Sequence, residues 1–485
     1  MPIELIPEMP REECGIAAVL GDPEAAKVAY LGLYSLQHRG QEAAGIAAFD
    51  GPNLAIHRGQ GLVADVFNRE NLNGLSGRIA LGHVRYSTTG GNSEANIQPL
   101  VAHTRFGPCA LAHNGNLINS NRLRAELECE GAIFQTTMDT EIILHLLARS
   151  QAGNFFAALV DSLTEVQGAY SIVAVREGEL IALRDPRGIR PLCLGRKGGA
   201  WLVASESCAF SVVGGEYVRD VEPGEFVTLT ERGLRSDFPI RPRREAFCIF
   251  EFIYYSRPDS VIGGEGVYDK RLEMGRQLAR EHPVEADVVV PVPDSSNVAA
   301  LGFSRESGVP FAMGLIRSHY VGRTFIEPDQ RIRHFGAKLK YTPVASVLRD
   351  RRVVVVDDSI VRGTTGGKIV AMLREAGARE VHVRISSPPF RNPCFYGIDT
   401  PSRVELMAAN HSLEEIRRLM GADSLGYLSI EGLRRVFGGR DRFCMACFTN
   451  EYPEGVPIGE EFSKHAHEGR VTVSTGRGNG KGRVY

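Results

Sequence analysis

The stretch VVVVDDSIVRGTT, residues 353–365, carries the most specific structural information in the chain. Four valines followed by two acidic residues predict a buried strand with carboxylates at its carboxyl end. The turn that follows is rich in glycine and threonine and leads into TTGGKIVAMLREAG at 364–377, which has the pattern of a helix. This order of strand, turn and helix predicts a ligand-binding loop at the edge of a parallel sheet.

The loop has the chemistry of a phosphate site. Its backbone N–H groups and hydroxyls can hold a phosphate at the start of the following helix. The residues that would do so are Gly363, Thr364, Thr365 and Gly366. Asp357 and Asp358 would face ribose hydroxyls or Mg²⁺. A Walker A loop is excluded, because Arg362 stands six residues before Lys368, where that motif needs glycine.

The same alternation of strands and helices continues through the second half of the chain. ADVVVPV at 286–292 and EVHVRIS at 380–386 read as strands, and NVAALGFSRES at 297–307 reads as a helix. Such alternation predicts an α/β domain with a parallel sheet and crossover helices.

The first half, from residue 14 to about 240, has a different pattern of expected strands and helices. Short strands such as 171–175, 180–184 and 201–205 are bounded by turn residues and fit hairpins. One-sided apolar periodicity predicts helices at 24–38 and 139–149. We therefore expect an α+β domain with mostly antiparallel sheets, and a boundary near 240 where the chain becomes rich in proline and charge.

Composition limits the classes of function. A length of 485 residues fits two or three domains. Lys and Arg number 56 and Asp and Glu 58, so the net charge of −2 gives no bulk attraction to nucleic acid or a membrane surface. No apolar run is long enough to span a bilayer and the N-terminus does not resemble a signal peptide, so we expect a cytoplasmic protein. Nine cysteines in such a chain favour catalysis or metal ligation over disulfides.

Cys14 begins a second informative pattern. It is followed by QHRGQEAAGIA at 37–47, GHVRYSTTG at 82–90, HNGNL at 113–117 and MDTE at 138–141. Each polar residue alone would more often be an ordinary surface residue, and Cys14 alone a packed core cysteine. In this order, the segments resemble the N-terminal-nucleophile (Ntn) glutamine amidotransferases. The resemblance implies an αββα sandwich over residues 14–240 and removal of residues 1–13 as a propeptide.

The resemblance also assigns roles in glutamine hydrolysis. In that family the freed α-amino group of the cysteine is the general base for its own thiol. Cys14 would then attack the glutamine amide, with Asn114 and the backbone N–H of Gly115 as the oxyanion hole. Arg85 would bind the α-carboxylate of glutamine and Asp139 its α-ammonium group.

Residues 353–365 in turn resemble the fingerprint of the type I phosphoribosyltransferases, which bind 5-phosphoribosyl 1-diphosphate (PRPP). PDSSN at 293–297 ends another predicted strand, and the resemblance places Ser295 with Asp357 and Asp358 around one Mg²⁺ per subunit. The basic segment 323–340 lies where that family has a flexible loop that closes over PRPP.

Four further cysteines suggest a metal cofactor. Cys444 and Cys447 form a C-x2-C pair, which alone fits zinc, an iron–sulfur cluster or a dithiol. One branch of the glutamine PRPP amidotransferases has both a propeptide and one [4Fe–4S] cluster per subunit, and Cys248 and Cys394 match its other two ligand contexts. Four thiolates can hold either metal, so the choice of iron rests on the resemblance. The other cysteines are expected to be packed in cores: Cys109, Cys129, Cys193 and Cys208.

Together these segments resemble the amidophosphoribosyltransferase family over nearly the whole chain. The expected division is a propeptide 1–13, an Ntn domain 14–240, a phosphoribosyltransferase domain 241–451 and a polar, flexible tail 452–485. The family hydrolyses glutamine and uses the ammonia to displace pyrophosphate from PRPP, giving 5-phosphoribosylamine, the first committed step of purine synthesis. It also implies a homo-oligomer, a dimer or tetramer, inhibited by purine nucleotides, with no nucleic-acid or membrane partner.

Two alternatives remain open from the sequence. Another Ntn amidotransferase, such as a glucosamine-6-phosphate synthase, would share the first domain but would not need DDSIVRGTT. A non-catalytic regulator that binds PRPP and senses oxygen through a cluster would not need Cys14 as a free N-terminus. Glutamine hydrolysis that depends on PRPP distinguishes the enzyme from the regulator.

Overall fold

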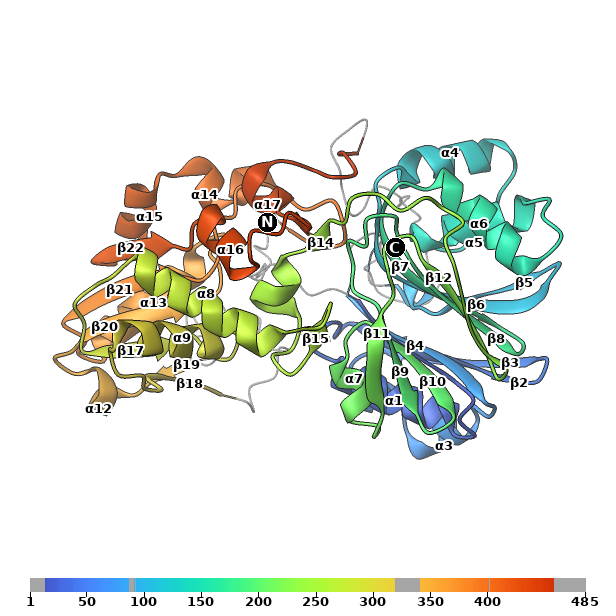
Figure 1. Cartoon of the computed structure of the whole chain (residues 1–485), viewed down its shortest axis with the longest axis horizontal. Helices are drawn as coiled ribbons and strands as arrows, with labels where there is room; N and C mark the ends of the chain where they lie inside the picture. The colour runs from blue at the N-terminus through green and yellow to red at the C-terminus, as the bar shows by residue number, and fades with distance from the viewer. Residues whose placement is uncertain (1–13, 87–90, 92, 319–340, 401, 458–485) are drawn as a thin grey trace, which may run out of the picture.

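The chain forms two lobes that lie side by side (Figure 1). The computed structural model describes residues 14–86, 91, 93–318, 341–400 and 402–457. The first lobe comprises residues 14–237 and the second 247–457. The expected propeptide, the basic segment 323–340 and most of the expected tail lie outside the described residues. Among the helices that are described, none combines the length and apolarity needed to cross a membrane.

Two antiparallel sheets form the centre of the first lobe. The seven-stranded sheet has the order β11 (Glu216–Asp220), β9 (Cys193–Lys197), β10 (Ala200–Ala204), β1 (Gly15–Leu20), β4 (Ile79–Arg85), β2 (Ala43–Asp50), β3 (Asn53–Gln60). The six-stranded sheet has the order β13 (Gly233–Asp237), β12 (Phe226–Thr230), β8 (Glu179–Arg184), β7 (Gly168–Arg176), β6 (Gly107–Leu117), β5 (Leu100–Thr104).

Helices cover the outer faces of both sheets (Figure 1). They are α1 (Ala25–Ser35), α2 (Val63–Val66), α3 (Arg69–Asn73), α4 (Ser120–Cys129), α5 (Thr140–Arg149), α6 (Phe155–Glu165) and α7 (Cys208–Ser211), with a 3₁₀ turn at Glu94–Asn96. Alternation along β1 explains the layering, because Ile16 and Leu20 pack between the sheets whereas Ala17 and Val19 pack in the cluster that includes α1. The expected αββα sandwich is confirmed.

The second lobe contains the expected parallel sheet. Its order is β17 (Val288–Pro291), β20 (Arg352–Asp357), β21 (Glu380–Ile385), β22 (Ser424–Tyr427). Val354 and Val356 pack in one core cluster and Val353 and Val355 in another, so β20 is buried on both faces. This is why its sequence is a continuous valine run rather than an alternation.

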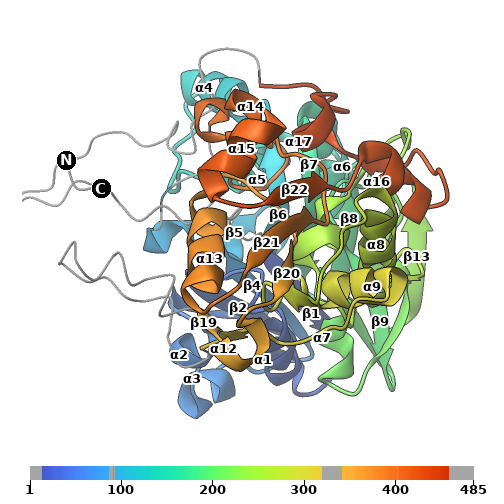
Figure 2. The same cartoon turned by 90° about the vertical axis from the view of Figure 1, so that its left-hand side faces the viewer.

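Helices flank this sheet on both sides, with α8 and α9 on one face and α13 on the other (Figure 2). The helices of the second lobe are α8 (Val267–Glu281), α9 (Asn297–Ser307), α12 (Ala345–Leu348), α13 (Thr364–Glu375), α14 (Met407–Asn410), α15 (Leu413–Met420), α16 (Ile430–Val436), α17 (Ala446–Thr449), a π-helix at Glu251–Tyr255 and a 3₁₀ turn at Arg403–Glu405. Three small two-stranded pairs complete it: β14 (Phe247–Cys248) with β23 (Phe443–Cys444), β15 (Val261–Ile262) with β16 (Glu265–Gly266), and β18 (Leu315–Arg317) with β19 (Tyr341–Pro343).

The two lobes share a hydrophobic core. Ala169 and Ile189 of the first lobe belong to the same buried cluster as Phe250, Phe390 and Tyr396 of the second. This shared packing fixes elements of the second lobe against β7 and the segment after β8.

Candidate functional site

The site of the first lobe is assembled around Cys14, which directly precedes β1. Arg85 ends β4 and Asp139 directly precedes α5, and both act electrostatically on the Cys14 thiol. Asn114 lies on β6, the strand whose Leu117 N–H donates a hydrogen bond to Asp139 Oδ2 at 2.9 Å. The structure therefore brings residues of both sheets and of α5 to one place.

The Cys14 thiol is buried and protonated at neutral pH. Its Sγ–H donates to the main-chain oxygen of Tyr86 at 3.4 Å. Burial raises the pKa of Cys14 to about 11, and the nearby positive charge of Arg85 offsets only part of this effect. A thiol in this state needs a base close by before it can act as a nucleophile.

The side-chain amide of Asn114 is buried in the first lobe. It is 1% exposed, and neither its Oδ1 nor its Nδ2 forms a hydrogen bond within the described part of the chain. Buried amides are almost always bonded, so this one is available to a ligand. The adjacent Gly115 has φ +151°, and a Cβ there would lie 2.0 Å from the Ala169 carbonyl oxygen, so the position requires glycine.

Opposite charges flank the thiol. Burial lowers the pKa of Arg85, whereas the negative groups Glu42 and Asp139 raise it. Arg85 Nη2 donates to the Gly91 carbonyl oxygen at 3.1 Å. The site thus offers a cation and two carboxylates beside Cys14. Glu42 was not singled out from the sequence, since nothing distinguishes it from a surface acid in the segment 37–47.

The second site lies at the carboxyl ends of β17 and β20. Ser295 Oγ donates to Asp358 Oδ2 at 2.5 Å, and Ser296 Oγ donates to Asp357 Oδ1 at 3.2 Å. Burial raises the pKa of Asp358, although the hydroxyls of Ser295 and Ser359 lower it in part. The three predicted residues therefore meet at the sheet edge. Ser296 was not singled out, because nothing in the segment 293–297 distinguishes it from its neighbours.

The glycine-rich turn follows directly. Gly363 is the N-cap of α13 with φ +78°, and a Cβ there would lie 2.0 Å from Met407 Sδ. A Cβ on Gly366 would lie 2.5 Å from Met420 Cε. Thr364 and Thr365 form the first turn of α13. The turn is thus held close to α14 and α15, and its backbone N–H groups stand at a helix N-terminus.

The four predicted ligand cysteines converge in the second lobe. Cys248 and Cys444 lie opposite each other in the parallel pair β14 and β23. Cys248, Cys394 and Cys444 all lie close enough to Cys447 in α17 to raise the pKa of its thiol. Burial raises the pKa of all four thiols. Within the described ranges, no group of three or more His, Cys, Asp or Glu side chains is arranged to hold a metal ion.

The remaining cysteines differ from one another. Cys109, Cys193 and Cys208 are buried, as expected. Cys129 is exposed, so its predicted place in a core is wrong. It is the last residue of α4, and the buried face of that helix is made by Leu123 and Leu127 instead.

Known proteins resemble the chain over most of its length. A family model for a glutamine amidotransferase domain matches residues 83–212. Amidophosphoribosyltransferase 1 of Arabidopsis thaliana, described as chloroplastic, is 53% identical over 92% of this chain and 79% of its own. The chain belongs to the amidophosphoribosyltransferase family. It is thus a glutamine-dependent PRPP amidotransferase, an enzyme of purine biosynthesis.

Solved structures agree with this membership. The glutamine PRPP amidotransferase of Bacillus subtilis, complexed with ADP and GMP, has a TM-score of 0.87 and 49% identity, covering 91% of this chain and 98% of its own. A structure described as the allosteric regulatory enzyme of purine biosynthesis has a TM-score of 0.90 and 48% identity, covering 94% of this chain and 99% of its own.

In this amidophosphoribosyltransferase the segment after Cys394 touches the first site. Asn116 Nδ2 donates to the Phe395 carbonyl oxygen at 3.0 Å. A Cβ on Gly397, whose φ is +108°, would lie 3.1 Å from Gly115 Cα. The second lobe therefore forms part of the wall beside Gly115. No sequence motif predicted this contact between distant segments.

Proposed function

We propose that the first lobe hydrolyses glutamine at Cys14 and that the β17–β20 edge of the second lobe binds PRPP. The first assignment is carried by the buried Asn114 amide, which has no hydrogen-bond partner among the described residues and lies in the same site as the Cys14 thiol. Arg85 would bind the α-carboxylate of glutamine and Asp139 its α-ammonium group. These two contacts would direct the side-chain amide of glutamine toward Cys14 Sγ.

The chemistry of the first step then follows from the site. The α-amino group of Cys14 takes the thiol proton as Sγ attacks the amide carbon, and it returns that proton to the leaving nitrogen. Asn114 Nδ2 and the Gly115 N–H donate hydrogen bonds to the oxyanion that forms. Ammonia leaves, a thioester to Cys14 remains, and water hydrolyses it to glutamate. Because an amide nitrogen cannot accept the proton, residues 1–13 must first be removed.

The second step uses the ammonia before it is protonated in bulk water, so we propose that it passes between the lobes. At the second site the backbone N–H groups from Gly363 to Gly366, with the hydroxyls of Thr364 and Thr365, would hold the 5-phosphate of PRPP. Asp357 and Asp358 would orient the ribose hydroxyls. Nitrogen then bonds to C1 of the ribose as the C1–pyrophosphate bond breaks, which yields 5-phosphoribosylamine.

The oxygen ligands at this edge suit Mg²⁺. Ser295, Asp357 and Asp358 would hold one ion per subunit, which when bound neutralises charge on the pyrophosphate. Mg²⁺ usually takes few protein ligands beside water and substrate phosphates, so a complete protein cage is not required.

The four buried thiols fit one [4Fe–4S] cluster per subunit, held by Cys248, Cys394, Cys444 and Cys447. A cluster spreads its thiolates over several iron atoms instead of gathering them around one ion. Four thiolates can also hold zinc, so the choice of iron rests on the resemblance to the cluster-containing branch of the family. Anaerobically purified protein should contain about four iron and four sulfide per chain, and stoichiometric zinc without sulfide would contradict the proposal.

We propose several further properties by resemblance to the family. The domain division is 1–13, 14–240, 241–451 and 452–485. Because the Bacillus subtilis structure contains ADP and GMP, we infer inhibition by purine nucleotides. A homo-oligomer, dimer or tetramer, and a cytoplasmic location complete the proposal, although the Arabidopsis relative is described as chloroplastic.

An anaerobic assay of pyrophosphate release from PRPP and Mg²⁺ tests the assignment. Glutamine and ammonia are supplied in separate arms, and the mass of the active chain is measured intact. The proposal requires turnover in both arms from a chain that begins at Cys14. Full glutamine-dependent activity from protein that retains residues 1–13 would overturn the nucleophile mechanism.

A further inference from the structure

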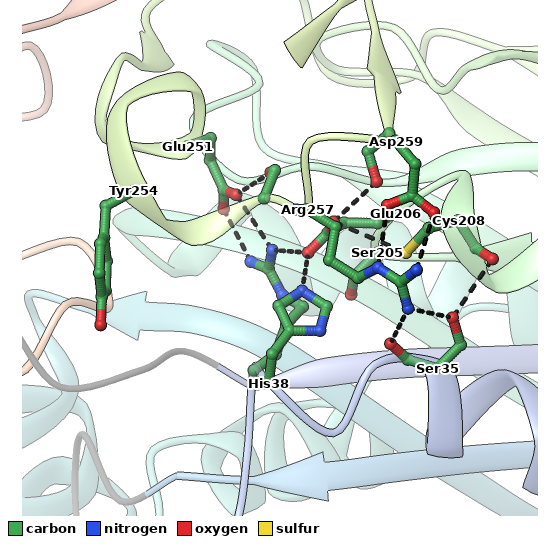
Figure 3. A network of polar contacts seen from close by, with 12 residues as sticks. Ser35, His38, Ser205, Glu206, Cys208, Glu251, Tyr254, Arg257 and Asp259 are labelled. Atoms are coloured by element: carbon green, nitrogen blue, oxygen red, sulfur yellow. Dashed lines mark hydrogen bonds and ion pairs between the residues drawn. The ribbon is translucent and has the colours of Figure 1, made fainter. Parts of the chain in front are cut away.

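A buried network of ion pairs joins the two lobes and reaches the main chain of Cys14; Figure 3 shows its two carboxylates, Glu206 and Glu251. Its central residue is Arg39, which follows α1 and whose side chain is fully buried. Arg39 Nε donates to the main-chain carbonyl oxygen of Cys14 at 3.2 Å. Its Nη1 donates to Glu206 Oε1 at 2.6 Å, and its Nη1 and Nη2 donate to the two oxygens of Glu251 at 3.0 and 2.7 Å. One guanidinium thus binds the main chain of the nucleophile and a carboxylate of the second lobe.

Both carboxylates are fixed from other sides as well. Glu251 also accepts hydrogen bonds from Arg190 Nη2 and from Ser256 Oγ. Glu206 is also bound by the His38 ring, the Arg257 N–H and the Ser260 hydroxyl. Figure 3 shows the two carboxylates converging from different segments. The position of the Arg39 guanidinium is therefore determined by its partners, and it cannot shift without breaking several bonds.

The network pairs two buried arginines with two buried glutamates. Arg39 and Arg190 carry two positive charges and Glu206 and Glu251 two negative ones, with all four side chains fully buried. Burial opposes ionisation of Glu251, but Arg39 and Arg190 outweigh it and lower its pKa to about 2. The pKa of Glu206 is likewise lowered to about 2, against burial, by His38 and Arg39. The network is ionised at neutral pH, and removal of one charge leaves its partner buried and uncompensated.

The network can affect catalysis because Arg39 binds the main chain of Cys14. The nucleophilic Sγ and the α-amino base belong to the same residue, so rotation of the Cys14 main chain displaces both. Arg39 Nε binds the main-chain carbonyl oxygen of Cys14, directly before β1 begins at Gly15. A small displacement of reacting groups is enough to cost about 10²-fold in rate.

We propose that Arg39 and Glu251 are positioning residues for glutamine hydrolysis, and that the first site is complete only with this carboxylate from the second lobe. The proposal deepens the role assigned to Cys14 and rests on it. Arg39 orients the Cys14 main chain, and Glu251 orients Arg39. Neither residue is expected to touch glutamine, because Arg85 and Asp139 supply its charged partners.

Two substitutions test the proposal in the full-length, processed enzyme. Arg39→Lys keeps the charge but loses the planar set of donors that reaches Cys14 and both carboxylates at once. Glu251→Gln keeps the shape but removes the charge that fixes Arg39. Asp259→Asn is the matched control, since it breaks an exposed ion pair with Arg257 in the same region and leaves Arg39 untouched. Measurements are kcat and KM for glutamine hydrolysis, ammonia-dependent synthesis, and the rate of Cys14 alkylation by iodoacetamide.

We expect kcat for glutamine hydrolysis to fall about 10- to 100-fold in both variants. KM for glutamine should stay within about threefold and ammonia-dependent synthesis within about twofold, with slower Cys14 alkylation. Values like those of Asp259→Asn, a rise in KM alone, or parallel loss of both activities would overturn the proposal. If Arg39→Lys does not fold, Glu251→Gln decides the question by the same criteria.

Cys14→Ala, assayed beside them, separates this inference from the proposed function. If Cys14→Ala still hydrolyses glutamine, the nucleophile assignment itself is wrong. If it abolishes hydrolysis while Arg39→Lys and Glu251→Gln match the control, only the positioning role fails.

Discussion

The two sites of the molecule are built in opposite ways. The site of the second lobe is largely local, since the end of β20 and the turn after it supply most of its residues and Ser295 joins from the neighbouring strand. The site of the first lobe draws Cys14, Arg85, Asn114 and Asp139 from separate elements, and the second lobe contributes to its wall. A local site can be recognised from one stretch of sequence, whereas a distributed site depends on the packing of the whole fold.

The largest expected effect separates the two sites completely. Cys14→Ala should lower glutamine-dependent synthesis by at least about 10³-fold, because it removes the only proposed nucleophile. Ammonia-dependent synthesis should stay within about twofold, since the second site is untouched. Cys129→Ala, which removes an exposed thiol, is the control. Equal loss of both activities would show that the sites are not separate.

A second substitution tests the local site. Asp357→Asn combined with Asp358→Asn should lower synthesis from either nitrogen source by about 10²-fold or more, because ribose and Mg²⁺ lose their carboxylates. Asp287→Asn is the control, since Asp287 pairs with Arg352 at the opposite end of the same strands. Steady-state release of pyrophosphate measures the effect, and near-normal ammonia-dependent turnover in the double variant would refute the PRPP assignment.

A third substitution probes the wall shared by the lobes. Gly397→Ala should lower glutamine hydrolysis by about tenfold, because its methyl group presses on Gly115 in the proposed oxyanion hole. Gly131→Ala carries a similar backbone strain at φ +93° but meets no atom within 4 Å. An unchanged kcat in Gly397→Ala, or an equal fall in both variants, would mean that the contact does not affect the oxyanion hole.

The smallest expected effect concerns pH. The pKa values of Glu206 and Glu251 are about 2 in the folded chain and near 4.5 when unfolded, so their contribution to stability is complete above about pH 5. It is lost as pH falls toward 2, when these carboxylates take up protons. The ionisation of Glu206 and Glu251 should therefore change the urea midpoint of unfolding little between pH 8 and 5. Glu251→Gln should flatten the decline below pH 4.5, and an identical decline in this variant would contradict the assignment.

Regular elements with a strong pattern could be predicted from the sequence. The helix expected at 297–307 is α9, and the valine run forms β20 as expected. The helix expected at 24–38 is Ala25–Ser35, since the chain turns after Leu36 and does not continue the helical pattern. Short elements could not be predicted, because pairs of two residues such as β14 and β23 are too brief to show periodicity.

The sites divide in the same way. The ordered segments placed Cys14, Arg85, Asn114 and Asp139, whose positions in the structure converge, although their roles stay predictions. Nothing predicted Arg39 as a contact of Glu251, 212 residues away along the chain. Such contacts depend on how the lobes pack. Arg39 lies in the segment 37–47 that carries the resemblance, but that segment does not tell which residue of the second lobe it contacts.

The Arg39 network also bears on how independent the first lobe can be. A chain cut near residue 240 would keep Arg39 and Arg190 but lose Glu251, the carboxylate that both buried guanidinium groups bind. The excess charge would have to be hydrated, which opens the region behind Cys14 to water. The first lobe is therefore not a portable glutaminase module, and fusing it to an unrelated synthase would require an acidic side chain from the new partner at the position that Glu251 occupies here.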